Sequence, residues 1–309
     1  MFKTKNHIGI DFSTVNTRIY IHNKGIIYDE PTTMCHKKDT NKIITGFEAK
    51  DYASNNDDVL LVNPLLEAPN QDLIKYCVSI IKKLKVKVFS LNIYVLSFSI
   101  ELNEEEQQKL VKACKLRKKD QIYFIDPLIL SAIGNDIDIT SNSKKLIVNI
   151  GASTSSAAII AENQISIHET LPVDGKFLDF SIVKYLKLKH NLDISFDEAN
   201  EIKIKLVDLS GKVNKKILIQ GIEIDSNELR PIIGENIDRL CQSLKLLLDV
   251  LSTSTLESIR ETGMFLIGGT SSINGIDKYI KEKLNIKVNV GPNPLNGLIE
   301  GMIKTFKNL

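Results

Sequence analysis

Cysteine is scarce in this sequence of 309 residues, and its four copies are scattered. Cys35, Cys77, Cys114 and Cys241 include no CxxC pair, so the sequence indicates neither a zinc site nor a disulfide framework. Free cysteines are typical of proteins in a reducing cytosol. We therefore expect a cytoplasmic protein.

Long apolar runs are absent as well. No segment approaches the roughly 20 apolar residues of a membrane-spanning helix, and the first residues lack the apolar core of a signal peptide. Met1 and Phe2, followed by Lys3 and Lys5, suggest a weak contact with the inner face of the cell membrane. The simpler alternative is a frayed terminus.

Signatures of several common protein classes are missing. The net charge of +2 and the lack of an arginine-rich arm argue against a nucleic-acid partner. The sequence contains no Walker motif and no GxGxxG. Its five histidines are scattered, and no Ser-His-Asp catalytic triad can be recognised in the sequence.

One short turn, in contrast, is present twice. Residues 8–17 run from an apolar strand through Asp11 into a bend of small and hydroxyl residues, and then into a second strand. Residues 147–156 repeat this pattern, with Asn149 standing 138 positions after Asp11. Two such hairpins, each opening one half of the chain, predict two related lobes that grip one anionic ligand from opposite sides.

The chemistry of these turns suits phosphate. Backbone N–H groups in such turns form concavities that bind phosphate oxygens, and Asp11 at a strand end is suited to hold Mg²⁺ through water. The alternative is a polar hairpin in which Asp11 bonds to its own backbone.

A third motif, Gly268-Gly269-Thr270-Ser271-Ser272, follows a strand. Its glycines allow a close backbone approach, and the following helix offers its N-terminus to a phosphate.

The order of expected elements indicates an α/β protein, because strands precede helices twice. Asn103 is expected to cap a helix whose first turn holds Glu104 to Glu106, and Pro127 to begin the next helix. In the second half, Asp197 is expected to cap another helix.

At these motifs the sequence resembles the actin-like ATPases and, within them, the bacterial MreB family most closely. MreB proteins open with G-I-D-L-G-T-A-N-T and later carry D-I-G-G-G-T-T and G-G-G-S. The corresponding segments here are Gly9-Ile10-Asp11-Phe12-Ser13-Thr14-Val15-Asn16-Thr17, Asn149-Ile150-Gly151-Ala152-Ser153-Thr154-Ser155 and Gly268-Gly269-Thr270-Ser271. Further similar segments are Gly46-Phe47-Glu48-Ala49-Lys50 and Asn274-Gly275-Ile276-Asp277, so the match runs over nearly the whole chain.

The resemblance implies an actin-like fold of two lobes, each with a mixed sheet flanked by helices, and a nucleotide cleft between the lobes. Lobe I is expected to comprise residues 1–141 and 292–309, with a small inserted subdomain at 32–65. Lobe II is expected to comprise residues 142–291, with an inserted subdomain at 190–255.

The resemblance also implies the ligands, which are ATP or ADP with Mg²⁺. The first turn would face the phosphates, the second would grip them from the other lobe, and the third would pass beside the adenosine. A helix of lobe II would line the adenine pocket, and Asp11 would hold Mg²⁺ through water. The implied binding residues are Asp11, Ser13, Thr14, Asn16, Thr17, Gly151, Ala152, Ser153, Thr154, Asn200, Lys203, Gly268, Gly269, Thr270 and Ser271.

Three departures from the MreB pattern concern the chemistry. Ser13 replaces a glycine, which matters if this position needs a positive φ. Asn149 replaces an acidic residue that would help to hold Mg²⁺. The catalytic glutamate of the family corresponds to Pro127, or to Asp126 if a gap is allowed, and a positioning error of ~1 Å can cost on the order of 100-fold in rate. We therefore predict weak hydrolysis, with Asp126 and Thr154 as candidate catalytic residues.

On this basis we expect a protein that binds ATP and polymerises with itself, or with MreB-like paralogues, into filaments for cell shape or polarity. Two alternatives stay open. The first is a competent filament ATPase that uses Asp126, and the second is a nucleotide-free scaffold that caps or partners another filament.

Overall fold

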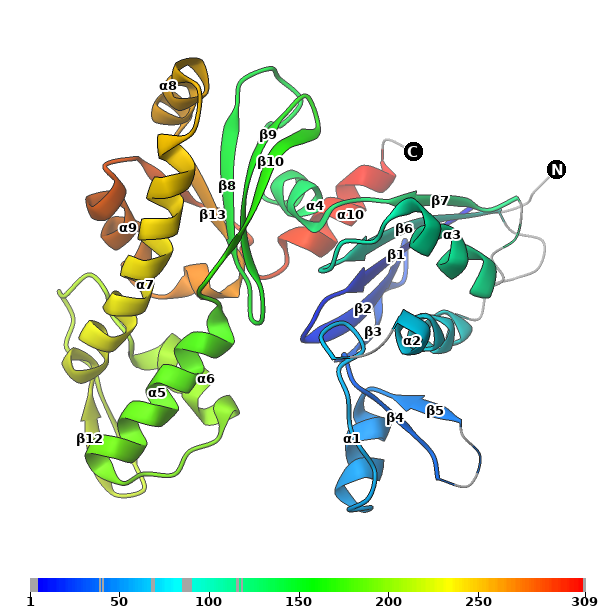
Figure 1. Ribbon diagram of the computed structural model, residues 1–309, viewed down its shortest axis with the longest axis horizontal. Coiled ribbons are helices and arrows are strands. Elements are labelled where there is room, and N and C mark those ends of the chain that lie inside the picture. Colours follow the sequence, from blue (N-terminus) through cyan, green and yellow to red (C-terminus); the bar gives the residue numbers. More distant parts are fainter. Residues whose placement is uncertain are drawn as a thin grey trace. The chain divides into compact units, whose positions relative to one another are not determined.

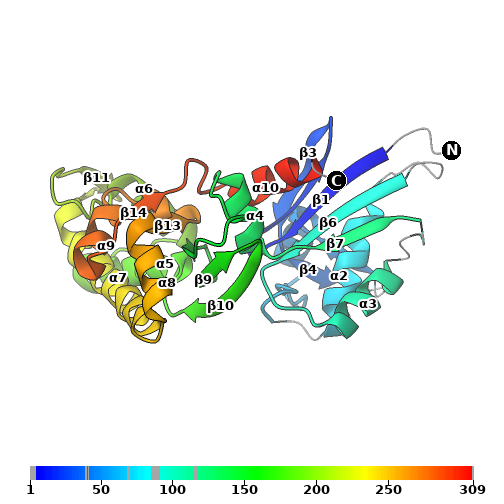
Figure 2. The same ribbon diagram turned by 90° about the horizontal axis from the view of Figure 1, so that it is seen from above.

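The computed structural model describes residues 5–38, 40, 42–67, 70–84, 91–114, 117 and 119–307. The chain forms two compact units (Figure 1, Figure 2). Unit 1 extends to Pro127 and includes the C-terminal segment from Met302, whereas unit 2 is Leu128–Gly301. The chain therefore passes twice between the units. The lobe boundary expected after residue 141 lies further along the chain than this division, and it stays a prediction.

Unit 1 is built on a five-stranded mixed sheet in the order β3-β2-β1-β6-β7. Its strands are β1 (Lys5–Phe12), β2 (Asn16–Ile21), β3 (Gly25–Pro31), β6 (Leu91–Phe98) and β7 (Gln121–Phe124). The first three are antiparallel neighbours, whereas β6 and β7 run parallel to β1. Alternate residues Ile8, Ile10 and Phe12 of β1 share one core with helices α2 (Asn70–Lys82) and α3 (Glu104–Ala113).

Unit 2 repeats this plan in the order β10-β9-β8-β13-β14. Its strands are β8 (Lys145–Ile150), β9 (Ser155–Ala161), β10 (Gln164–Leu171), β13 (Met264–Ile267) and β14 (Val288–Val290). Its helices are α4 (Pro127–Gly134), α5 (Gly175–His190), α6 (Phe196–Leu206), α7 (Ser226–Asp249), α8 (Thr253–Thr262), α9 (Ile276–Leu284) and the start of α10 (Gly297–Phe306). Val148 of β8 packs in the core with α5 and α7, and its neighbour Ile147 packs with α4, so helices cover both faces.

The two sheets agree in strand order, strand direction and hairpin register. Asp11 of β1 pairs with Arg18 of β2, and Asn149 of β8 pairs with Ser156 of β9, so each partner lies seven residues further along the chain. The two turns recognised in the sequence therefore close at the same register. This confirms the predicted α/β fold, in which two related lobes each carry a mixed sheet flanked by helices.

Two small hairpins extend this plan. In unit 1, β4 (Met34–His36) and β5 (Ile43–Thr45) pair and pack with α1 (Phe47–Ser54) through a core of their own. In unit 2, β11 (Lys216–Ile219) and β12 (Ile222–Asp225) are joined by Gln220 and Gly221, which both have positive φ as two-residue hairpins require.

Local signals predicted most helix starts. Asn103 caps α3 and forms a capping box with Glu106, and Pro127 occupies the first position of α4, as expected. The cap expected at Asp197 is wrong, because Ser195 caps α6 by accepting a hydrogen bond from the N–H of Glu198. Ser195 and Glu198 form the S-x-x-E capping box, which lies two residues earlier than the prediction.

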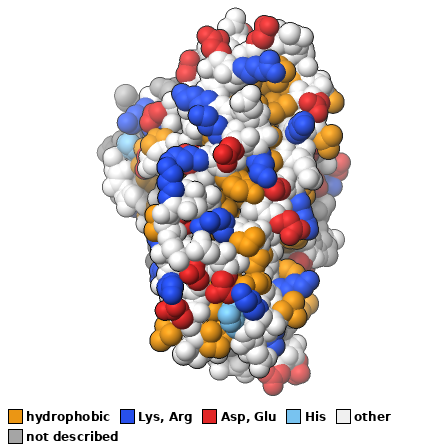
Figure 3. All heavy atoms as spheres, turned by 90° about the vertical axis from the view of Figure 1, so that its left-hand side faces the viewer, with side chains coloured by type: hydrophobic (Ala, Val, Ile, Leu, Met, Phe, Trp, Pro, Cys, Tyr) orange, Lys and Arg blue, Asp and Glu red, His pale blue; other side chains and the backbone are white. Residues whose placement is uncertain are grey.

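The described part of the chain contains no helix that is both long and apolar enough to cross a membrane. Met1 and Phe2, the predicted membrane contact, lie outside the described residues. On the face in Figure 3, Lys and Arg side chains are interspersed with Asp and Glu side chains.

Candidate functional site

The parallel strands of unit 1 bring three polar residues to one edge of its sheet. Asp11 lies one residue before the end of β1, Ser97 of β6 is its register partner, and Asp126 follows the end of β7. Open α/β sheets bind ligands outside the carboxyl ends of their parallel strands. The structure therefore places Asp126 at the same edge as the first turn.

Asp11 is a buried carboxylate with 4% of its surface exposed. The hydroxyl of Ser13 donates a hydrogen bond to it. Burial raises the pKa of Asp11 to about 6, against the lowering effects of the Ser13 hydrogen bond and of Arg18. The carboxylate is thus mainly charged at neutral pH, and a bound cation or a further donor would stabilise this form.

The first turn, residues 13–15, is tied to unit 1 through its carbonyl groups. Thr32 donates to two of them, from its hydroxyl to the Ser13 carbonyl (2.6 Å) and from its N–H to the Val15 carbonyl (2.8 Å). Asn63 donates from Nδ2 to the carbonyl between them (2.6 Å). In a trans peptide the C=O and the next N–H point in opposite directions. The N–H groups after these carbonyls therefore point away from Thr32 and Asn63, as in an anion-binding concavity.

Two predicted binding residues directly after the first turn, at the start of β2, form hydrogen bonds that hold it. Thr17 is fully buried, and its hydroxyl lies 2.8 Å from that of Tyr76 and 2.9 Å from that of Thr32. Asn16 donates to Asp29 (2.7 Å). These bonds fix the turn, and the contact of Asn16 and Thr17 with a ligand stays a prediction.

Ser13 is not strained, although the resemblance implies a glycine at its position. It is not among the described non-glycine residues with positive φ. Serine therefore fits this backbone, and its hydroxyl gives Asp11 a partner that glycine would lack.

The second turn, residues 151–154, is tied back by backbone groups. The N–H groups of Gly175 and Lys176, in the first turn of α5, donate to the carbonyls of Gly151 (2.9 Å) and Ala152 (2.7 Å). The N–H groups that follow these two carbonyls consequently point away from α5. Unit 2 thus directs two amides of its turn away from the element that holds the turn, as unit 1 does.

Hydroxyl groups add donors at the second turn. The Oγ atoms of Ser153 and Ser155 are buried and have no hydrogen-bond partner among the described residues, and the same holds for Ser97 at the edge of unit 1. Buried polar atoms usually have a partner. These hydroxyls are therefore available as donors, Ser153 and Ser155 at the second turn and Ser97 at the sheet edge of unit 1.

The third motif contacts the end of β8, directly before the second turn, through Gly268. Its backbone, with φ 89° and ψ 161°, lies in a region that is essentially restricted to glycine. A Cβ on Gly268 would clash with Asn149 Oδ1 and would lie 2.5 Å from the Ile150 carbonyl oxygen. Residues Gly269–Ser272 form a short 3-10 turn, and the helix expected after this motif, α9, begins at Ile276.

Helix α6 positions the two residues that the resemblance assigns to the adenine pocket. Asn200 is exposed. Lys203 is 3% exposed, and its ammonium donates to Asp179 (2.7 Å) and to the Gly175 carbonyl (3.0 Å). The adenine contact of both residues stays a prediction. The sequence analysis did not identify Asp179. Its place next to Leu178 on the buried face of α5 could have indicated it, because a buried carboxylate needs a partner.

No cluster of three or more His, Cys, Asp or Glu side chains that could hold a metal ion occurs among the described residues. Magnesium is usually held by one or two carboxylates together with phosphate oxygens and water. Asp11 is a single buried carboxylate beside the outward amides of the first turn. It therefore fits a magnesium site that is shared with phosphate and water, and not a site made of protein ligands alone.

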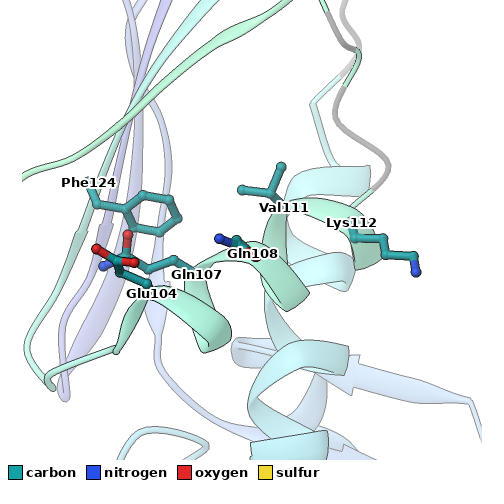
Figure 4. A pocket seen from close by; sticks show the side chains of 6 residues that line it. All are labelled: Glu104, Gln107, Gln108, Val111, Lys112 and Phe124. Atoms are coloured by element: carbon teal, nitrogen blue, oxygen red, sulfur yellow. The ribbon is translucent and has the colours of Figure 1, made fainter.

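A hollow of about 470 Å³ lies elsewhere in unit 1, beside α3 (Figure 4). Five of its lining residues come from α3 and one from β7, namely Glu104, Gln107, Gln108, Val111, Lys112 and Phe124. None of the predicted binding residues lines it. The hollow is therefore separate from the turns.

Known proteins resemble this chain over both units. A family model described as MreB/Mbl protein matches residues 5–309. The cell shape-determining protein Mbl of Bacillus subtilis is 25% identical over 309 residues, which cover 94% of this chain and 92% of that relative.

Solved structures share the fold. MreB5 of Spiroplasma citri bound to ADP superposes with a TM-score of 0.83 at 24% identity, covering 99% of this chain and 97% of that chain. The MamK double helical filament superposes with a TM-score of 0.73 at 17% identity, covering 99% of this chain and 100% of that chain.

We predict that Gly268→Ala lowers the free energy of unfolding by about 3 kcal/mol, because a clash with β8 adds to the strain of a backbone region reserved for glycine. Gly221→Ala is the matched control. Gly221 also has a positive φ (83°), but its surroundings are open for 4 Å around the place that a Cβ would take, so we expect a loss of about 1 kcal/mol. Urea unfolding measures both, and equal losses would contradict the role of the close approach.

We also predict that Asp11→Asn stabilises the ligand-free protein at neutral pH by roughly 3 kcal/mol, because it removes a desolvated carboxylate. The pKa of Asp11 rises on folding from 3.8 to about 6, so the unfolded state loses this proton more readily. Wild-type stability should therefore fall as the pH rises from about 4 to 6.

The gain from Asp11→Asn should accordingly be full above about pH 6 and small near pH 4. Chemical unfolding in EDTA between these values measures it. Asp57→Asn, at an exposed carboxylate of the same unit, is the control. A gain that does not change with pH would contradict the assignment to Asp11.

Proposed function

Because the chain belongs to the MreB/Mbl family of bacterial actin homologues, we propose that it binds ATP and polymerises into filaments that support cell shape or polarity. Family membership confirms the resemblance recognised in the sequence. The observation that carries the proposal is the pair of turns, one in each unit, whose carbonyls are tied back so that amide N–H groups point outward. A single turn of this kind is common in proteins. Here two such turns close at the same register of two related sheets, so we treat them as a matched pair.

The chemistry of ATP or ADP fits these turns. Their phosphates supply the negative charge and the acceptor oxygens that outward amides and unpartnered hydroxyls need. The S. citri relative was solved with ADP bound, which supports the same class of ligand here. In our proposal both turns contact the phosphates, Gly268 to Ser271 pass beside the adenosine, and Asn200 lies near the adenine.

Asp11 is proposed to hold Mg²⁺ through water. The bound ion would neutralise part of the phosphate charge. The carboxylate of Asp11 would accept hydrogen bonds from a water of the ion, and Ser13 would keep the carboxylate oriented. Asn149, at the equivalent position of unit 2, is neutral and can add no charge to this site.

Assembly is proposed between copies of this chain, and with MreB-like paralogues where a cell contains them. The MamK relative was solved as a double helical filament, which supports this mode of assembly. Head-to-tail contacts between identical subunits generate such filaments when their rotation does not close a ring. We place the filament in the cytoplasm, with Met1 and Phe2 as a weak contact to the membrane's inner face.

Hydrolysis is proposed to be weak. Asp126 is one methylene shorter than the glutamate that the family uses, and Pro127 cannot polarise water. Thr154 in the second turn is the other candidate catalytic residue. A competent ATPase is the second candidate function, favoured by the position of Asp126 at the sheet edge that also carries Asp11.

We predict that the purified protein sediments and forms filaments visible by electron microscopy when ATP and Mg²⁺ are present. Ser153→Glu should weaken ATP binding by roughly 100-fold, because it places a negative charge among outward amides. Ser254→Glu, at an exposed position of α8, is the matched control. A wild-type protein that neither sediments nor binds ATP in calorimetry would contradict the proposal and favour the nucleotide-free scaffold.

We predict that phosphate release, measured in the same tube as sedimentation, is slow and depends on Asp126. Asp126→Ala should lower the remaining rate by about 100-fold, since general-base groups contribute on this scale. Pro127→Ala next to it is the control and should leave the rate within a few-fold. An unchanged rate in Asp126→Ala would exclude Asp126 as the base.

A further inference from the structure

Lys203 and Asp179 form a buried ion pair inside unit 2. Their side chains are only 4% and 8% exposed, and Lys203 Nζ lies 2.7 Å from Asp179 Oδ1. The other lysine of α6 near this point, Lys205, makes an ion pair of the same length with Glu201, but those two side chains are 69% and 67% exposed. Exposed pairs contribute little to stability, whereas removing one partner of a buried pair is strongly destabilising.

The buried ammonium also holds the start of α5. Lys203 Nζ donates to the carbonyl of Gly175 at 3.0 Å. Gly175 in turn donates from its N–H to the carbonyl of Gly151 in the second turn at 2.9 Å. A single residue, Gly175, therefore connects Lys203 to the turn through its two backbone polar groups.

Gly175 leaves little space around this connection. A Cβ at this position would lie 3.2 Å from Ala152 Cα, from the Gly151 carbonyl oxygen and from Thr270 Oγ1. The start of α5, the second turn and the third motif are thus packed closely around one glycine. A shift of Gly175 would change the direction of the amides in the second turn.

We propose that Lys203 and Asp179 are positioning residues, which fix the second turn for phosphate binding without touching the nucleotide. This inference rests on the proposed function. If Lys203 turned toward a ligand, Asp179 would stay behind as a buried carboxylate without its partner, which is strongly unfavourable. Through its hydrogen bond to the Gly175 carbonyl, the ammonium of Lys203 instead acts on the backbone that holds the second turn.

The number of phosphates on the ligand distinguishes positioning from direct contact. A lysine that contacts adenine contributes to the binding of ATP, ADP and adenosine alike. A lysine that positions the second turn contributes only to ligands with phosphates. Destabilisation of the whole protein would not produce this selectivity at a temperature where every variant is folded.

The test uses the double variant Asp179→Leu/Lys203→Met, because removing both charges leaves no unpaired charge in the interior. Lys205→Met is the matched control on the same helix. Binding of ATP, ADP and adenosine is measured by calorimetry or by competition with a fluorescent nucleotide, and thermal unfolding checks that each variant is folded.

We expect the double variant to bind ATP and ADP about 10-fold more weakly, on the scale seen when residues that orient a binding group are removed. Adenosine binding should stay within about twofold, and Lys205→Met should match the wild type for all three ligands. An equal loss for adenosine would overturn the inference in favour of direct contact, and unchanged ATP binding would overturn it outright. Absence of any nucleotide binding by the wild-type chain would overturn the proposed function and this inference with it.

Discussion

The direction of a few peptide groups is the constraint on which the rest of the site depends. A peptide that accepts a hydrogen bond through its carbonyl must turn the following N–H to the opposite side. In unit 1, Thr32 and Asn63 occupy the carbonyls of the turn, and in unit 2 the start of α5 does so. Each turn therefore has carbonyls that are held by the rest of its unit, and the N–H groups that follow these carbonyls point to the opposite side. An anion is the ligand that such donors select.

The two units reach this result by different means, which affects how they tolerate substitution. The tie in unit 1 uses the side chains of Thr32 and Asn63, so a single substitution at either position removes a hydrogen bond. The hydrogen bonds in unit 2 come from backbone N–H groups, which among the natural residues only proline would remove, but they require the close packing at Gly175. The first turn therefore depends on the identity of two side chains, whereas the second turn depends on the position of the backbone at the start of α5.

The sequence predicted what is decided locally. The two turns, the cap at Asn103 and the start of α4 at Pro127 follow from residues that lie next to each other in the chain. The pairing of Lys203 with Asp179 joins two helices across 24 positions, and one sequence contains no signal for which carboxylate a buried lysine will meet. The 3-10 turn after Gly268 could not be predicted for a similar reason, because Gly268, which precedes it, packs against the end of β8, far away in the sequence. Ser195 was a local signal that was simply read two residues too late.

Two buried charges near the turns differ in how well the protein compensates them. Lys203 has a carboxylate and a carbonyl within hydrogen-bonding distance, so it is satisfied without a ligand. Asp11 has the Ser13 hydroxyl, yet burial still raises its pKa to about 6, which means that the folded protein disfavours its charged form. A group that binds next to the charged carboxylate and supplies positive charge or donors relieves this penalty and stabilises the folded state by mass action. The raised pKa of Asp11 therefore supports the proposal that a cation or a hydrogen-bond donor binds beside it, whereas Lys203 already has its hydrogen-bond partners within unit 2.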